Sequence, residues 1–150
     1  MDALINGIKV PHELLGDLKE THLRESDDTS LRNSLEQDGY LFLKNVIDLE
    51  KIIRARNDIF KTLNEVKELK DPFSDGIASG ESIRDQIHKD RGVFWKNVSS
   101  TKSLRDITNG NVLESVFTRI FGSSAKGFDF IFLRAVAGGK FTAMHCDAGF

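Results

Sequence analysis

Two long stretches of the chain place apolar side chains three and four residues apart, the spacing that gathers them on one face of an α-helix. In residues 49–66 every position of this stripe except Arg56 is apolar, and Asp48 can accept hydrogen bonds from the free N–H groups at the helix start. Residues 111–121 repeat the stripe, and Gly122 follows as a typical helix terminator. The pattern therefore predicts two amphipathic helices.

The residues before the first of these helices carry shorter signals. Residues 1–29 have weak periodicity and scattered charge, which predicts a weakly structured lead-in. A helix is expected from about Ser30, with Asp28, Thr29 or Ser30 as its cap and Gly39 at its end. Tyr40–Leu43 is then a short apolar run between turn signals, which predicts a buried strand.

The segment between the two long helices is less regular. Glycines, a proline and several charges in residues 68–91 indicate a long surface loop. Val93–Trp95 indicates a strand or an anchoring turn.

Residues 126–150 are strand-like. Phe128–Val136 is aromatic and β-branched with alternating character, and a second extended run, Lys140–Asp147, follows Gly138-Gly139. Two such runs around a glycine pair predict a hairpin or a corner between two sheets. The expected fold is one α+β domain with a mainly β core, with helices and first strands in residues 30–125 and the first core strands in residues 126–150.

Charge and composition exclude some classes of partner. The formal net charge of −2 argues against nucleic acid or an anionic membrane as the main partner. No apolar run approaches the about 18 residues of a membrane span, and the N-terminal residues lack the pattern of a signal peptide. The single cysteine, Cys146, fits a reducing compartment, so a cytoplasmic location is expected. The oligomeric state is not determined by the sequence.

The last residues, Ala148-Gly149-Phe150, follow the strand-like region directly, without a cap, a turn or a polar tail. A strand edge left unpaired at this point would be unusual for a native protein. The chain is therefore expected to be a fragment of a longer domain.

His145-Cys146-Asp147 is the main candidate for chemistry. In a strand, residues two positions apart point to the same face, so this imidazole and this carboxylate can converge on one metal ion. They are two members of a 2-His-1-carboxylate triad, which leaves adjacent positions on Fe(II) open for a co-substrate and O₂. The alternative is a hydrogen-bonded surface pair without a metal.

The same spacing occurs once more, in His88-Lys89-Asp90. This match lies in a charged stretch, residues 84–91, with no strand pattern to fix its geometry. It is interpreted as a solvated loop histidine, and its presence shows that the spacing alone is weak evidence.

Arg134 is the second candidate. In a hairpin at Gly138-Gly139, Arg134 faces Ala143 and shares a face with His145 and Asp147. A charge on an otherwise aromatic face needs a partner, which could be Asp147, a substrate carboxylate or a structural acid.

Four segments follow one another in a familiar order: Asp38–Val46 with the long helix after it, Val93–Ser99, Phe128–Val136, and His145-Cys146-Asp147. Together they resemble the phytanoyl-CoA dioxygenase-like family of Fe(II)- and 2-oxoglutarate-dependent oxygenases, and the later segments resemble a bacterial-type branch of it. The resemblance covers about residues 30–150.

The resemblance implies a double-stranded β-helix, or jelly roll, with helices packed outside it, of which this chain would be the N-terminal part. His145 and Asp147 would be two ligands of Fe(II), Arg134 would contribute to binding of the co-substrate 2-oxoglutarate, and the intact parent would hydroxylate a small-molecule substrate with O₂. In that family the distal histidine and the arginine that binds 2-oxoglutarate lie downstream, beyond Phe150. The 150-residue chain is therefore expected to be inactive by itself.

Two other functions stay open. One is a non-catalytic relative or interaction module of the same fold that keeps the helical face. The other is a zinc hydrolase, which would need a general base and a closed ligand set that the sequence does not supply.

Overall fold

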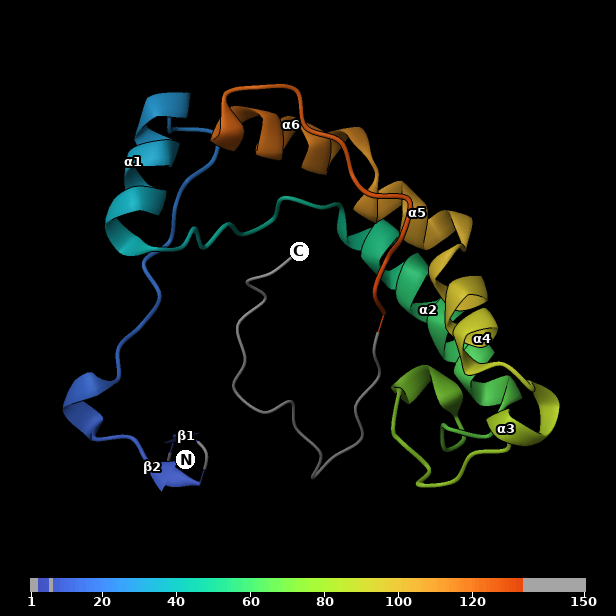
Figure 1. Cartoon of the computed structure of the whole chain (residues 1–150). Coiled ribbons are helices and arrows are strands. Elements are labelled where there is room, and N and C mark those ends of the chain that lie inside the picture. The colour runs from blue at the N-terminus through green and yellow to red at the C-terminus, as the bar shows by residue number, and fades with distance from the viewer. Residues whose placement is uncertain (1–2, 6, 134–150) are drawn as a thin grey trace.

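The computed structural model describes residues 3–5 and 7–133, and helices dominate this part of the chain. The elements, in chain order, are β1 (Leu4–Ile5), β2 (Ile8–Lys9), the 3₁₀ turn η1 (His12–Leu14), α1 (Asp28–Asp38), α2 (Leu49–Glu65), the 3₁₀ turn η2 (Phe73–Asp75), α3 (Arg84–Ile87), α4 (Arg91–Ser99), α5 (Lys102–Thr108) and α6 (Asn111–Phe121). Strands β1 and β2 pair antiparallel in a small hairpin that lies apart from the helices (Figure 1).

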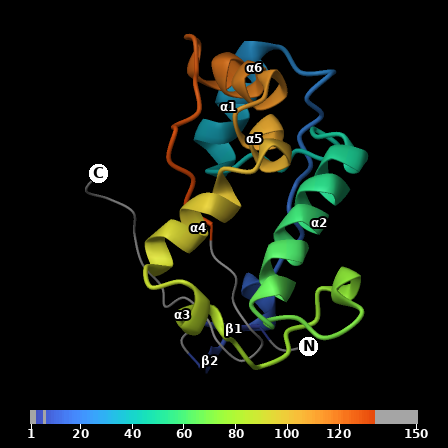
Figure 2. The same ribbon diagram turned by 90° about the vertical axis from the view of Figure 1, so that its right-hand side faces the viewer.

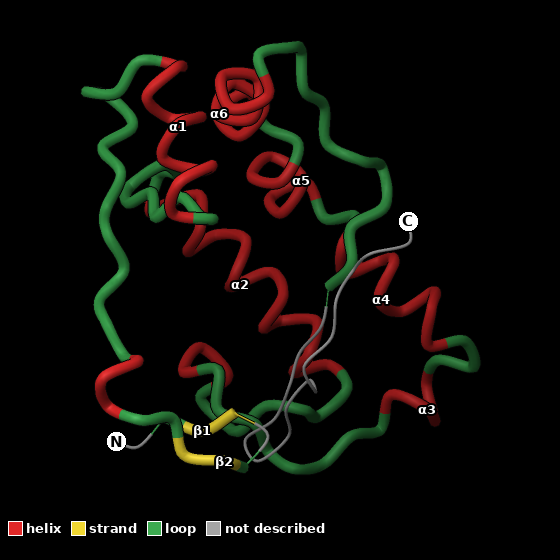
Figure 3. The backbone as a smooth tube through the Cα atoms, turned by 60° about the vertical axis from the view of Figure 1, so that its left-hand side comes forward, coloured by secondary structure: helices red, strands yellow, loops and turns green. Residues whose placement is uncertain are grey.

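The helices are arranged as an arch (Figure 1). Helix α1 packs beside α6, α6 touches α5, and α5 packs along α2. Helix α4 begins beside α3 and ends beside α5, and α2 extends along the same part of the molecule (Figure 2). Most of the chain between β2 and α1 is loop, as Figure 3 shows.

Side-chain caps explain where the main helices begin. The Asp48 carboxylate accepts hydrogen bonds from Glu50 N at 2.8 Å and Lys51 N at 3.2 Å, which confirms the predicted start of α2. Helix α1 is capped one residue earlier than predicted, because Asp27 accepts from Ser30 N at 2.7 Å.

Glycines end two of the helices. Gly39 after α1 and Gly122 after α6 have φ of 74° and 69°, a left-handed conformation that costs glycine little. Both predicted helix ends are thus confirmed.

The main apolar core joins α2 to α4. Leu63 and Val66 from the end of α2 pack with Phe94 and Val98 of α4, and each of the four is at most 5% exposed. Trp95 packs against this cluster from its edge. The predicted stripe of α2 is therefore buried only toward its C-terminal end, since Ile52 and Ile53 remain 41% and 38% exposed.

Residues 67–83 form a hook, which folds back on the end of α2. Ser79 N donates to Glu68 O, and Ile83 N donates to Val66 O, both at 2.9 Å. The hook is closed by an ion pair between Arg84 and Glu68, whose side chains are only 18% and 17% exposed. The surface loop was predicted for residues 68–91. The hook is such a loop apart from η2, but the prediction is wrong at Arg84–Ile87, which form helix α3.

Arg119 of α6 fastens the N-terminal loop to the helical arch. Its guanidinium donates to Asp28 Oδ1 at 2.6 Å, to Leu23 O at 2.9 Å and to Ser26 O at 2.5 Å. The chain before α1 is thus held by a residue that lies far downstream in the sequence.

The expected jelly-roll core is wrong for this structure. About half of the described residues lie in helices, and β1 and β2 form the sole sheet among them. Residues 128–133, expected to begin the first core strands, form no strand and pair with no other strand in the described chain, and Asp129 lies in a bend. An alternating pattern indicates which face a strand would bury, but a sheet also requires a second strand to satisfy its backbone groups.

Two smaller predictions are corrected as well. Val93–Trp95 lies inside helix α4 and forms neither a strand nor a turn. The predicted strand Tyr40–Leu43 is reduced to a single parallel bridge between Phe42 and Glu20. Short apolar runs fit a buried helical turn as well as a strand, so tertiary packing decides between them. No helix in the described residues has the length and apolar character needed to cross a membrane.

Candidate functional site

The residues predicted to bind metal and co-substrate lie outside the described part of the chain. This holds for His145 and Asp147, and also for Arg134. Among the residues that the structure describes, no three His, Cys, Asp or Glu side chains converge in a way that could hold a metal ion.

The second His-x-Asp match has structural roles in the fold. The Asp90 carboxylate caps α4 and accepts from Gly92 N at 2.7 Å and Val93 N at 3.3 Å. The ring of His88 lies against Phe94, with ring centroids 5.0 Å apart. His88 is half-buried against an aromatic ring, not fully solvated as the sequence suggested. Both side chains thus contribute to the start of α4.

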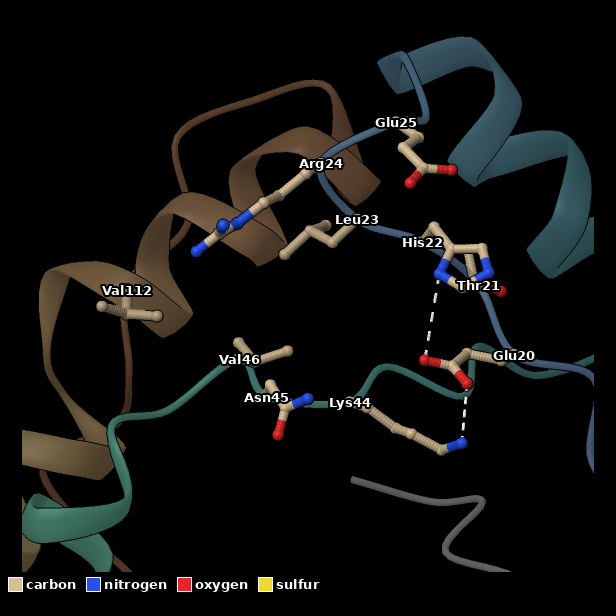
Figure 4. A pocket seen from close by; sticks show the side chains of 10 residues that line it. All are labelled: Glu20, Thr21, His22, Leu23, Arg24, Glu25, Lys44, Asn45, Val46 and Val112. Carbon is tan, nitrogen blue, oxygen red and sulfur yellow. Dashed lines mark hydrogen bonds and ion pairs between the residues drawn. The ribbon is translucent and has the colours of Figure 1, made fainter.

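A hollow lined largely by polar side chains lies between the loop before α1 and the connection to α2 (Figure 4). Its volume is about 390 Å³. Glu20 lines one side of it, between His22 and Lys44, with Oε2 2.6 Å from Lys44 Nζ and Oε1 3.9 Å from His22 Nδ1. The backbone joins the same two segments, because Thr21 N donates to Phe42 O at 2.9 Å.

The charges of this hollow favour a structural role. The hydrogen bond from Lys44 lowers the pKa of Glu20 below its ordinary value, and it outweighs the opposing effect of desolvation. A carboxylate with a lowered pKa is a weak general base near neutral pH. We therefore interpret Glu20, His22 and Lys44 as an ion cluster that holds residues 20–22 beside residues 42–44.

A larger and almost wholly apolar groove of about 510 Å³ lies on α6. One wall consists of Leu113, Phe117 and other apolar side chains of α6, and the opposite wall comes from Leu35 of α1 and from residues 41–47. Phe117 is 44% exposed and Phe121 is 64% exposed, so much apolar surface of α6 faces solvent. The described residues leave this groove open.

A second apolar surface lies on the segment after α6, in residues 128–133. Phe128, Phe130 and Phe132 are 87%, 77% and 78% exposed. Side chains of α5 hold the start of the segment: Asn109 Nδ2 donates to Phe128 O at 3.1 Å, and Arg105 donates to the carbonyls of Phe128 and Asp129.

The sequence predicted the apolar faces of the helices, but it did not predict the groove on α6 or the exposed phenylalanines of residues 128–133. The stripe of residues 111–121 predicted one wall of the groove, and the apolar run in residues 41–47 was the signal for the other wall. Helix α5 was missed altogether. Its short length leaves less than two full turns from which to read a period.

Comparisons with known protein families, with curated proteins and with solved structures found no match to this chain.

Proposed function

We propose that His145 and Asp147 are two ligands of an Fe(II) ion in an oxygenase that uses 2-oxoglutarate as co-substrate. The observation that supports this proposal is the pair His145-Cys146-Asp147 at the end of an alternating apolar run, preceded by segments in the order of the phytanoyl-CoA dioxygenase-like family. The proposal needs these two side chains and a third ligand. It does not need the jelly-roll core that the described residues lack.

The roles of the other His-x-Asp match also favour this assignment. Asp90 is engaged as the cap of α4, and His88 packs on Phe94. A carboxylate that already accepts two backbone hydrogen bonds is less available to a cation. Of the two matches, His145-Cys146-Asp147 is therefore the better candidate for metal binding.

Each proposed ligand has a defined task. His145 would bind the metal through a neutral imidazole nitrogen, and Asp147 would offset part of its charge. When bound, Fe(II) and 2-oxoglutarate supply the chemistry for O₂-dependent hydroxylation of a small molecule, with succinate and CO₂ as the other products. Arg134, two residues after Phe132, would contribute a cation for the co-substrate carboxylate. A cytoplasmic location is part of the same proposal.

Metal titration of the purified chain tests the ligand assignment. We expect anaerobic calorimetry with Fe(II) to show binding by the native chain, and His145→Ala or Asp147→Ala to weaken it by about tenfold or more. His88→Ala is the matched control, because it removes a histidine with the same spacing to an aspartate. Equal measurable Fe(II) affinity in the native chain and in His145→Ala would refute the assignment.

Co-substrate binding is measured in the same way. We expect 2-oxoglutarate to bind only when Fe(II) is present, and Arg134→Met to weaken this binding without changing the affinity for Fe(II). Binding of 2-oxoglutarate that is independent of the metal would contradict the proposed arrangement.

An interaction module is the second candidate function, and the apolar groove on α6 favours it. Such a module would bind neither Fe(II) nor 2-oxoglutarate, and its function would not change in His145→Ala. The two candidates are separated by the titrations above together with an apolar fluorescent dye. Dye binding that Phe117→Glu abolishes, in a chain that binds no metal, would support the second candidate.

A further inference from the structure

The ion cluster of Glu20, His22 and Lys44 occupies only one side of the hollow in Figure 4. Three apolar and two polar side chains line the other side: Leu23, Val46, Val112, Arg24 and Asn45. They come from three segments, which are the loop before α1, the connection to α2 and the first turn of α6. The volume of about 390 Å³ lies within the usual range for small-molecule sites.

Arg24 brings a cation without a partner to this side of the hollow. Its guanidinium makes no hydrogen bond or ion pair with another described residue. It extends over the hollow toward Val112, whereas the carboxylate of Glu25 points the other way (Figure 4). The lysine of the lining, Lys44, is already engaged by Glu20 at 2.6 Å. The hollow thus presents a planar set of N–H donors to which the described chain supplies no acceptor.

The backbone that carries Arg24 is fixed by its own turn and by α6. Ser26 N donates to His22 O at 3.0 Å, which closes a tight turn around Arg24. Arg119 of α6 donates to Leu23 O at 2.9 Å and to Ser26 O at 2.5 Å, so the same turn is tied to the helix. Because the backbone is already placed, a ligand has to order only the side chain of Arg24.

Asn45 and two valines complete this side of the hollow. Asn45 has a φ of 54°, a left-handed conformation that asparagine adopts more readily than most residues, and its amide supplies a second kind of donor. Val46 and Val112 add apolar surface. Val112 is 45% exposed, so part of its side chain is free to contact a ligand. The lining therefore combines hydrogen-bond donors with an apolar wall.

We propose that this side of the hollow binds a small organic monocarboxylate with an apolar body. The guanidinium of Arg24 would hold the carboxylate through two parallel hydrogen bonds, and the apolar wall would contact the hydrocarbon part. A cavity of about 150 Å³ holds one benzene molecule, so this hollow has room for a phenyl group and its carboxylate. A dianion fits less well, because Glu20 and Glu25 line the same hollow. Binding here requires none of the residues assigned above to the metal and to 2-oxoglutarate.

An NMR titration of the ¹⁵N-labelled full chain with phenylacetate tests the site. We expect saturable binding with a dissociation constant of about 1 mM, which is usual for a ligand of this size. The largest shifts are expected at the amides of Arg24, Asn45 and Val112. Phenylacetamide has the same shape without the charge, and it is expected to bind at least about tenfold more weakly. Equal affinities for the two compounds would overturn recognition of a carboxylate.

Variants on the two walls locate the ligand. Arg24→Met removes the charge and is expected to weaken phenylacetate binding about tenfold or more. Arg54→Met is the matched control, because Arg54 is an exposed arginine on α2, outside the hollow. Val112→Phe is expected to fill part of the hollow and to weaken binding as well. A native chain that binds no phenylacetate at about 20 mM, equal affinities in the two arginine variants, or unchanged binding in Val112→Phe would overturn the proposal.

A crossed comparison separates this site from the proposed co-substrate site. Arg24→Met is expected to leave the Fe(II)-dependent binding of 2-oxoglutarate unchanged, and Arg134→Met to leave the binding of phenylacetate unchanged. Phenylacetate is expected to bind in the absence of Fe(II). Binding that requires the metal would place the ligand at the metal and overturn the assignment to the hollow, whereas a failure of the Fe(II) titrations alone would not affect it.

Discussion

Arg84 and Glu68 form an ion pair that joins α3 to the base of the hook. One guanidinium nitrogen of Arg84 contacts both carboxylate oxygens of Glu68, and its distance to Oε2 is 2.5 Å. The guanidinium also lies over the rings of Phe94 and Trp95, at 4.9 and 4.6 Å from their centroids. The pair thus connects the hook to the main core.

Removing the carboxylate is expected to destabilise the fold. Glu68→Ala leaves the Arg84 guanidinium largely buried without its counter-charge, and we expect a loss of about 2–3 kcal/mol in the free energy of unfolding. Urea denaturation measures this loss. Lys102→Ala is the control, since Lys102 pairs with Asp106 at an exposed site and the loss there should stay below about 0.5 kcal/mol. Similar losses in the two variants would contradict the larger contribution to stability that we expect of the Arg84–Glu68 pair.

Phe94 is expected to be the most sensitive position of the core. Its side chain is 2% exposed between α2 and α4, so Phe94→Ala removes a buried ring and leaves a cavity. We expect a cost of about 3–5 kcal/mol in thermal or urea unfolding. The neighbouring Val93 is 49% exposed, and Val93→Ala should change stability by about 0.5 kcal/mol or less. A loss of stability in Phe94→Ala as small as that in Val93→Ala would contradict the placement of the main core between α2 and α4.

The cap of α1 predicts a dependence of stability on pH. The hydrogen bond from Ser30 N lowers the pKa of Asp27 below its ordinary value of 3.8, so the folded state favours the carboxylate. The stabilisation is present above the pKa of the unfolded chain and is lost as the pH falls through the lower, folded-state pKa. We expect the unfolding temperature to fall less steeply with acid in Asp27→Asn, which caps the helix without titrating.

This comparison runs from about pH 7 to about pH 2, so that it covers the titration of aspartate. Asp17→Asn is the control, since Asp17 lies in the exposed loop before α1 and caps no helix. Identical acid profiles for native chain and Asp27→Asn would show that the Asp27 cap does not contribute.

Arg105 and Asn109 are expected to protect residues 128–133 from proteolysis. Arg105→Ala removes hydrogen bonds to the carbonyls of Phe128 and Asp129, and the loss of about 1 kcal/mol corresponds to a roughly fivefold larger open population. Chymotrypsin cleavage next to Phe128, Phe130 and Phe132 should accelerate by a similar factor. Lys102→Ala, on the same helix, should leave the cleavage rate unchanged.

The helices could be predicted because their signals are local. Asp48 lies next to the N–H groups that it caps, and Gly122 ends α6 through its own backbone conformation. Even the error at α1 was small, since Asp27 performs the role that was assigned to the next three residues.

The secondary-structure predictions are wrong where strand pairing or tertiary packing determines which element forms. Phe94 forms part of an apolar run that fits a strand, yet its burial against Leu63 and Val66 requires the helix α4. The alternation of residues 128–133 predicted a strand that does not form. In the structure Leu133 packs against the core, and Phe128, Phe130 and Phe132 face solvent. A pattern of period two does not say which face is buried.

The candidate metal site remains a prediction. His145, Asp147 and Arg134 were chosen from sequence spacing and from a resemblance, and all three lie outside the described residues. The structure contributes the roles of His88 and Asp90, which no spacing rule could supply.

The three hydrogen bonds from Arg119 determine when residues 23–28 can reach their folded position during synthesis. Its partners at Leu23, Ser26 and Asp28 precede it by 96, 93 and 91 residues. At about 5–20 residues per second, a ribosome needs roughly 5 to 20 s to reach Arg119 after Asp28 is made. Throughout that interval the first residues of the nascent chain lack the side chain that fastens them, and chaperones and proteases have access to them before the arch closes.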